Sequence, residues 1–235
     1  MDFIDLGQKD YLEVWELQKE LAQKRSQGEI EDTLILVEHL PVYTVGRAQV
    51  EEKKEIIVPG KGKVPVISVE RGGKFTFHGP DQIVGYPIFK VPNQDLRAYL
   101  RGMERALIGS IKDALSLKVA PCPKTLLMDP GQLQTGVWIE DRKLGSIGIA
   151  VKKWVAFHGF SLNYSVDLRY FEAIEPCGFR GSIMTNLQKE ALVADDDLEA
   201  KKLLLKKMLV ENFQRFSILA GRDFNEKNRN QEVSL

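Results

Sequence analysis

Residues 143–177 read KLGSIGIAVKKWVAFHGFSLNYSVDLRYFEAIEPC, and this stretch bears on both the predicted sheet and the predicted chemistry. Its first half alternates apolar and polar residues and carries small residues near its start, which is typical of a half-buried sheet. It begins with Lys143 and ends with Cys177, 177 − 143 = 34 positions later. Cys177 lies between Pro176 and Gly178, a turn context that can hold a thiol at a cleft.

We hypothesise that Lys143 and Cys177 meet in the folded chain and act together. A thiol is nucleophilic as the thiolate, and a nearby ammonium favours that charged form. The alternative, from spacing alone, is that Cys177 is a small buried apolar residue and Lys143 a solvated surface cation.

Composition limits the classes of function. The chain has 235 residues, 43% hydrophobic and 28% charged, which is typical of one large or two small globular domains. Its 33 basic and 33 acidic residues balance, so a dedicated nucleic-acid binder is not expected. Two cysteines, Cys122 and Cys177, are too few for a disulfide framework. The histidines His39, His78 and His158 are widely separated, so no metal site is expected.

The N-terminal residues, MDFIDLGQKD, carry early acids and no basic segment before an apolar block, so they do not resemble a signal peptide. No apolar run approaches the roughly 20 residues that cross a membrane. We therefore expect a cytoplasmic protein without membrane contact, where a reducing environment suits a free reactive thiol.

Helices are predicted from apolar residues at three- and four-residue spacing. The spacing predicts helices over 8–25, over 95–116 with Asn93 or Asp95 as cap, and over a long stretch that follows the three acids 195–197, with Gly221 as its stop. Residues 222–235 are expected to form a polar tail outside the domain formed by 1–221.

Strands are predicted where β-branched and aromatic residues cluster. They fall at 33–38, at 42–45 after Pro41, at 64–70, 74–78 and 82–89 with a break at Pro87, and in the meander 136–140, 143–150 and 152–160. Residues 48–63 are expected to form a charged loop. The fold class is therefore α+β: a single domain with mixed or antiparallel sheets and flanking helices grouped on one side.

Six segments together resemble the lipoyl(octanoyl) transferase family. They are EHLPVYTVGR (38–47), RGGKFTFHGPDQIVGYP (71–87), TGVW (135–138), KLGSIG (143–148), WVAFHGFSLN (154–163) and PCG (176–178). Any one of them is a weak signal, but all six occur in matching order and spacing across most of residues 8–190.

The resemblance implies a fold like the catalytic domains of biotin and lipoate protein ligases, with 1–221 as the catalytic domain. It implies transfer of an octanoyl group from octanoyl-acyl carrier protein to a lysine of lipoate-dependent proteins, namely the lipoyl domains of 2-oxoacid dehydrogenases and the glycine-cleavage H protein. No ATP or other cofactor is implied. The family's nucleophile falls on Cys177 and its lysine partner on Lys143.

The family's acyl-site segments fall on three stretches of this chain. The residues are Arg71, Gly72, Gly73, Lys74, Phe75, Thr76, Phe77, His78, Ser146, Ile147, Gly148, Gly159, Phe160 and Ser161, with His158 as a residue that shapes the pocket. Phe75, Phe77 and Phe160 are candidates to line the acyl tunnel, although aromatics at strand spacing are also ordinary core residues. His39 is expected further out, in a structural role, and Cys122 is expected to be inert.

The implied chemistry has two steps. Cys177 attacks the thioester of the carrier and forms an acyl-enzyme, and the amine of the acceptor lysine then attacks the acyl group. Lys143 stabilises the thiolate as ammonium, or accepts a proton from the incoming lysine as a neutral amine. Backbone N–H groups near Gly178 or within 146–148 are alternative oxyanion donors.

Three departures and three alternatives stay open. Asp81 stands where the resemblance leads one to expect glycine, Gly145 is a conservative change, and 183–186 read IMTN where a Val-Thr-Ser run is expected. The alternatives are an ATP-dependent lipoate ligase, an amidotransferase that moves the acyl group between carrier proteins, and a non-catalytic acyl-binding module. The ligase is less favoured because the chain has no glycine-rich phosphate loop of P-loop type.

Overall fold

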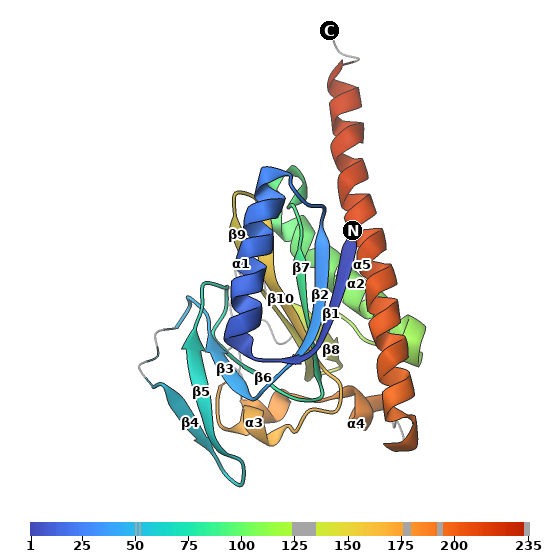
Figure 1. Cartoon of the computed structure of the whole chain (residues 1–235). Helices are drawn as coiled ribbons and strands as arrows, with labels where there is room; N and C mark the ends of the chain where they lie inside the picture. The colour runs from blue at the N-terminus through green and yellow to red at the C-terminus, as the bar shows by residue number, and fades with distance from the viewer. Residues whose placement is uncertain (50, 52, 124–134, 176–179, 192–194, 233–235) are drawn as a thin grey trace.

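A computed structural model of the chain describes residues 1–49, 51, 53–123, 135–175, 180–191 and 195–232, with the side chains of α5 described up to residue 217. Within these ranges, ten strands form a six-stranded and a four-stranded sheet (Figure 1). The expected α+β class is confirmed.

The larger sheet carries the core of the domain. Its order is β1-β2-β7-β10-β9-β8, formed by β1 (Asp2–Lys9), β2 (Thr33–His39), β7 (Gln82–Ile88), β10 (Val155–Asn163), β9 (Arg142–Lys152) and β8 (Gly136–Ile139). Every pairing is antiparallel except β1 with β2. The expected meander is present as β8, β9 and β10.

Helices cover both faces of this sheet. On one face, α1 (Tyr11–Gln27) packs Val14 and Ala22 against β2, β7 and β10. On the other, α2 (Leu96–Leu115) and α5 (Leu198–Glu232) lie side by side and bury a larger cluster (Figure 1). The expectation that the helices group on one side is therefore wrong, because α1 is amphipathic enough to cover the opposite face.

The smaller sheet lies at one end of the larger one in Figure 1. Its order is β4-β5-β3-β6, formed by β4 (Glu55–Val58), β5 (Gly62–Ser68), β3 (Val42–Val45) and β6 (Phe75–His78). It packs against α3 (Arg169–Glu172) and the segment around Met184. Short helical segments complete the description: η1 (Pro92–Gln94), η4 (Gly181–Ile183), α4 (Leu187–Ala191) and η5 (Asp195–Asp197).

Three sequence expectations fail at element ends. Residues 55–58 were expected within a charged loop but form β4, an exposed edge strand, and β1 is an edge strand that no sequence pattern predicted. Pro87 does not break β7. The pairing of β7 with β10 ends at Gly85, so no hydrogen bond to β10 is lost because Pro87 lacks an N–H group. Gly221 does not stop α5, since a single glycine costs a helix only about 1 kcal/mol.

Candidate functional site

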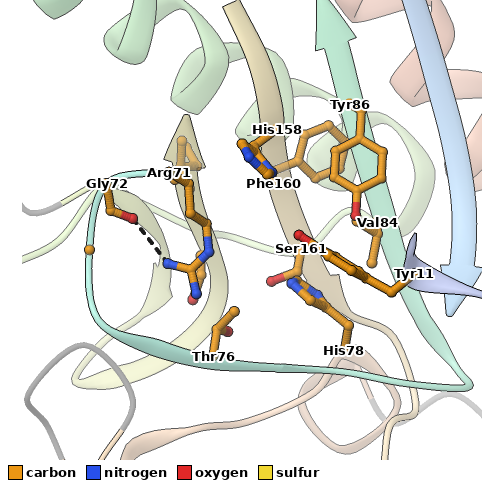
Figure 2. Close-up of a pocket in the computed structure, with 15 residues that line it drawn as sticks. Tyr11, Arg71, Gly72, Thr76, His78, Val84, Tyr86, His158, Phe160 and Ser161 are labelled. Carbon is orange, nitrogen blue, oxygen red and sulfur yellow. Dashed lines mark hydrogen bonds between the residues drawn. The ribbon is translucent and has the colours of Figure 1, made fainter. Parts of the chain in front are cut away.

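A pocket opens between the N-terminus of α1, β6 with the turn before it, and strands β7, β9 and β10 (Figure 2). Its cavity volume is about 40 Å³, roughly the share of one or two waters. The lining residues are Tyr11, Arg71, Gly72, Gly73, Thr76, His78, Val84, Tyr86, Ser146, Ile147, Gly148, His158, Gly159, Phe160 and Ser161. The three segments expected to form an acyl site therefore do converge on one pocket.

Strand alternation in β6 divides the predicted site residues. Thr76 and His78 line the pocket, whereas Phe75 and Phe77 lie in the core of the smaller sheet. There Phe77 stacks on Tyr170, with ring centroids 4.2 Å apart. Lys74 is exposed and lies outside the pocket lining. Of the three phenylalanines expected to line a tunnel, Phe160 alone does so, and the other two are core residues.

Arg71 fixes the turn at the mouth of the pocket. The side chain is buried, and Nη2 donates to the carbonyl oxygen of Thr44 at 2.7 Å and to Oγ1 of Thr44 at 2.8 Å. Nη1 donates to the carbonyl oxygen of Gly72 at 3.0 Å, as Figure 2 shows. Gly72 and Gly73 are exposed, so this turn forms the open end of the pocket.

The closed end is formed by Tyr11 and Tyr86, together with Val84, none of which was predicted as a site residue (Figure 2). The Tyr11 ring is nearly parallel to the His78 ring at 5.8 Å. His39 Nδ1 faces the Lys9 carbonyl oxygen at 3.1 Å, so Nδ1 carries the hydrogen and Nε2 accepts from the Tyr86 hydroxyl at 2.8 Å. Burial lowers the pKa of His39 to about 4. His39 thus stands behind the wall, as expected.

His158 enters the pocket from β10 in a left-handed backbone conformation, with φ of 55°. Its backbone N–H donates to Oε1 of Gln18 at 2.9 Å, which ties this residue to α1. Its Nε2 lies 3.5 Å from Oε2 of Glu70, an ion-pair distance without hydrogen-bond geometry. Burial lowers the pKa of His158 and outweighs the opposing effect of Glu70. The imidazole therefore forms a neutral wall of the pocket at neutral pH.

Asp81 shows how the chain departs from the expected glycine. Its φ is 62°, the left-handed region where glycine or Asp is tolerated. The Asp81 N–H donates to Oε2 of Glu38 at 2.9 Å, and Oδ1 lies 3.4 Å from Nζ of Lys202 on α5. Nζ of Lys202 also lies 2.6 Å from Oε1 of Glu38. The side chain of Asp81 thus connects the turn before β7 to the long helix.

A β-bulge determines the direction of Lys143. Between β8 and β9 the partner of Val137 is Gly145, but the partner of Trp138 is Lys143, so Leu144 is the extra residue. Val137 and Leu144 both pack in the helix-covered core. Lys143 and Trp138 therefore face the opposite side of the sheet, which is the side of the pocket.

Lys143 is buried on this side, with 2% of its surface exposed. Its Nζ lies 5.5 Å from the centroid of the Trp138 ring. A Cβ atom on Gly136 would lie 3.2 Å from Cε of Lys143, so the side chain runs across Gly136. Gly136 pairs with Ser146, which lines the pocket. Lys143 is not itself among the residues that line the pocket, but its side chain is buried beside the strand that contributes Ser146, and this burial excludes the alternative of a solvated surface cation.

Cys177 lies outside the described residues, but the chain on both sides of it is described. Downstream, Met184 forms a parallel bridge with Lys143, and the N–H of Thr185 donates to the carbonyl oxygen of Lys143 at 3.0 Å. Upstream, Ile174 packs in the same hydrophobic cluster as Met184. The two ends of the segment that holds Cys177 are therefore anchored in one cluster, and the downstream end runs beside Lys143.

Cys122 is the described cysteine, and it is half-buried. Burial raises the pKa of its thiol, an effect that the charge of Lys143 only partly opposes. A raised pKa lowers the thiolate fraction, which is the physical reason to expect that Cys122 is inert.

Among the described residues there is no group of three or more metal-ligating side chains of the His, Cys, Asp and Glu types. No described helix combines the length and apolarity needed to cross a bilayer.

Comparison with known sequences identifies the family. Residues 10–209 match the model of the lipoyl protein ligase A/B catalytic domain. An octanoyltransferase of Rubrobacter xylanophilus is 41% identical over 192 residues, covering 78% of this chain and 80% of that protein. An octanoyltransferase of Thermoanaerobacter pseudethanolicus is 36% identical over 230 residues, covering 96% of this chain and 92% of that protein.

Solved structures show the same fold. A lipoate-protein ligase A bound with ATP superposes with a TM-score of 0.64 at 16% identity, covering 96% of this chain and 95% of the other. A bi-partite lipoate protein ligase from Thermoplasma acidophilum gives 0.60 at 16% identity, covering 95% and 91%. The expected lipoate-ligase-like domain is thus confirmed. The chain belongs to the lipoyl protein ligase A/B catalytic-domain family, among its octanoyltransferases, and is an acyltransferase.

Proposed function

We propose that the protein transfers an octanoyl group from octanoyl-acyl carrier protein, through a thioester on Cys177, to a specific lysine of lipoate-dependent proteins. The observation that supports this proposal most is the burial of Lys143 beside the segment that leads back to Cys177. The bulge at Leu144 sets the Lys143 side chain beside Gly136, whose partner Ser146 lines the pocket, and the Lys143 carbonyl oxygen accepts from the N–H of Thr185. A cation in this position favours a thiolate nearby.

The first step forms one thioester and breaks another. The Cys177 thiolate attacks the carbonyl carbon of the octanoyl thioester, the bond from that carbon to the carrier sulfur breaks, and the carrier leaves as a thiol with a proton from the Lys143 ammonium, which becomes a neutral amine. The acyl chain occupies the pocket between Arg71 and Tyr86, in which Phe160 and Ile147 supply apolar surface. The oxyanion of the tetrahedral intermediate is stabilised by backbone N–H donors, for which the segments at Gly178 and at 146–148 are the candidates.

In the second step the ε-amine of the acceptor lysine attacks the acyl-Cys177 carbonyl carbon. An amide forms, the Cys177 thiolate leaves, and the amine's proton passes to Lys143 as a neutral amine or to solvent. The acceptors are lipoyl domains of 2-oxoacid dehydrogenases and the H protein of glycine cleavage. The names of the relatives support octanoyl transfer, and the two-step route predicts ping-pong kinetics.

Intact-mass analysis tests this proposal directly. We expect one octanoyl adduct on Cys177 after the protein is mixed with octanoyl-acyl carrier protein without ATP, and its loss when an apo lipoyl domain is added. Lys143→Ala should slow adduct formation about 100-fold or more, in the range of lost acid-base catalysis. Cys122→Ser is the matched control and should react normally.

Other outcomes would identify another enzyme. A requirement for ATP would indicate a ligase. Loading from octanoylated H protein but not from acyl carrier protein would indicate an amidotransferase. An unchanged rate for Cys177→Ser would contradict the covalent route.

A further inference from the structure

A chain of buried hydrogen bonds connects the pocket to the segment that flanks Lys143. It joins His78, Gln82, Asn163 and Thr185, which are all buried side chains, with exposed fractions between 0% and 6%. The links are His78 Nδ1 to Gln82 Oε1, Gln82 Nε2 to Asn163 Oδ1, and Asn163 Nδ2 to the Thr185 carbonyl oxygen, each 2.9 Å long. The chain crosses from β6 through β7 and β10 to the segment after Cys177.

The direction of every bond follows from the last one. The carbonyl oxygen of Thr185 can only accept, so the Asn163 amide nitrogen must face it. Oδ1 of Asn163 then accepts from Gln82, and Oε1 of Gln82 accepts from His78. His78 therefore carries its hydrogen on Nδ1, and burial lowers its pKa, which keeps the ring neutral.

The opposite nitrogen of His78 is consequently an acceptor. Nε2 lies 3.5 Å from Oγ1 of Thr44, and that oxygen already accepts from Nη2 of Arg71 at 2.8 Å. The hydroxyl hydrogen of Thr44 is thus available to His78. The chain runs in one sense from Arg71 at the mouth of the pocket to the Thr185 carbonyl.

The far end of the chain lies beside Lys143. Thr185 donates its N–H to the Lys143 carbonyl, and its carbonyl accepts from Asn163, so both sides of this peptide segment are held. Eight positions separate Thr185 from Cys177. A shift of the Thr185 segment would move both Lys143 and the chain that carries Cys177.

We propose that Gln82 and Asn163 are positioning residues, which fix the Nδ1–H form of His78 in the pocket wall and hold the Thr185 segment beside Lys143. They act through their neighbours and do not touch the reacting atoms. The expected effect of these residues on the rate of octanoyl transfer rests on the proposed function of Cys177. The expected tautomer of His78 is independent of that function.

The test pairs two Asn→Asp variants. Asn163→Asp keeps an acceptor for Gln82 but sets a carboxylate oxygen against the Thr185 carbonyl. We expect kcat for octanoyl transfer from octanoyl-acyl carrier protein to a lipoyl domain to fall about 10- to 100-fold, as for a misplaced reacting group, with KM for the carrier nearly unchanged. Asn186→Asp is the control. Asn186 is buried in the same segment and donates to the Val166 carbonyl at 3.1 Å, away from the chain, so kcat should stay within about threefold.

Nitrogen NMR of labelled histidine supplies the second readout. In the unaltered protein, His78 should show a protonated Nδ1 and a bare Nε2, assigned by loss of the signals in His78→Asn. Gln82→Met should mix in the Nε2–H form, whereas Asn186→Asp should not. A purely structural role would lower thermal stability without changing the tautomer.

Two results would overturn the proposal: an Nε2–H form of His78 in the unaltered protein, or a folded Asn163→Asp variant with the kcat of the Asn186→Asp control. The NMR measurement of the His78 tautomer uses the unaltered protein, so it tests the proposal even if the Asn163→Asp variant does not fold. If the unaltered protein transferred no octanoyl group, the proposed function would fail while the tautomer still tested the positions of Gln82 and Asn163.

Discussion

Three of the glycines that line the pocket differ in the room that each leaves for a methyl group. A Cβ on Gly72 would meet its nearest heavy atom, the carbonyl oxygen of Ile149, at 3.8 Å. A Cβ on Gly148 would lie 3.2 Å from the Gly72 carbonyl oxygen and 3.4 Å from Cδ of Arg71. A Cβ on Gly159 would lie 2.6 Å from Cδ of Pro87 and closer still to a backbone carbonyl oxygen of β7.

These distances predict three different outcomes for substitution to alanine. Gly159→Ala forces β10 and β7 apart by at least 3.4 − 2.6 = 0.8 Å, because the obstacle is backbone and a proline ring. Overpacking of this kind costs about 3 kcal/mol, which for a chain of this length lowers Tm by about 6–12 °C. Gly72→Ala meets only an ordinary contact at the exposed turn and should change the unfolding free energy by about 0.5 kcal/mol or less.

Gly148→Ala should separate activity from stability. Its Cβ fits with small adjustments, so we expect a loss of about 1 kcal/mol or less. The added methyl enters between Gly72 and Arg71, into a cavity of only about 40 Å³, and reduces the room there. The acyl chain should then lose its place, and the octanoyl-transfer rate should fall at least tenfold.

Denaturant unfolding and the rate of octanoyl transfer to a lipoyl domain, measured on all three variants, check this order. Gly72→Ala is the matched control, because it adds a methyl group to the same pocket and should leave the free energy of unfolding nearly unchanged. Transfer by Gly148→Ala at the unaltered rate would refute its placement in the acyl path. Unchanged stability of Gly159→Ala would refute the tight packing of β10 on β7.

Two further predictions concern charge. Lys202→Met should cost about 3 kcal/mol of unfolding free energy, because it leaves the largely buried Glu38 carboxylate without its cation. Asp81→Gly should be nearly neutral, because the Asp81–Lys202 contact is longer and half-exposed, and because glycine suits the left-handed backbone at this position. Equal losses of unfolding free energy in the two variants, measured in urea, would contradict this ranking. The pKa of His39 is about 4 in the folded protein and 6.5 in the unfolded chain, so the unfolded chain binds more protons between these pH values. The free energy of unfolding should therefore fall as the pH drops from 6.5 toward 4. At pH 5 the loss from this group should be about 2 kcal/mol. His39→Phe should remove that part of the pH dependence, and the same slope in both proteins would count against it.

The buried part of the fold could be predicted from sequence, and the edges could not. Strands β2 and β7 are almost wholly buried, so their apolar runs are visible in the sequence. β1 and β4 are exposed edge strands: β1 interleaves apolar residues with Asp2, Asp5 and Gln8, and β4 is a four-residue apolar run, EIIV, within a charged stretch. β1 pairs with β2, which follows only after α1 in the sequence, whereas β4 pairs with the next strand, β5, in a hairpin.

The site shows the same limit. Composition and spacing could not direct Lys143, because its orientation depends on the bulge at Leu144, which is a property of pairing with β8. The sequence and the resemblance both predicted Lys143, and the structure shows how the bulge places its side chain. Tyr11 falls within the predicted helix 8–25, and Tyr86 within the predicted strand 82–89. Neither carries a local signal for a pocket wall, because the wall exists only when α1 packs on β7.

Several polar side chains line the pocket, although its proposed occupant is an apolar acyl chain. Tyr86 donates its hydroxyl hydrogen to His39, and His78 donates to Gln82, so these polar groups face each other and away from the cavity. Arg71 turns its guanidinium onto neighbouring carbonyl oxygens. A hydrogen-bonded polar group costs little to cover with hydrocarbon, so these three side chains suit an apolar occupant. Among the described lining residues, Oγ1 of Thr76 and Nε2 of His158 are buried without a hydrogen bond, so these two atoms could bind a polar group of an occupant.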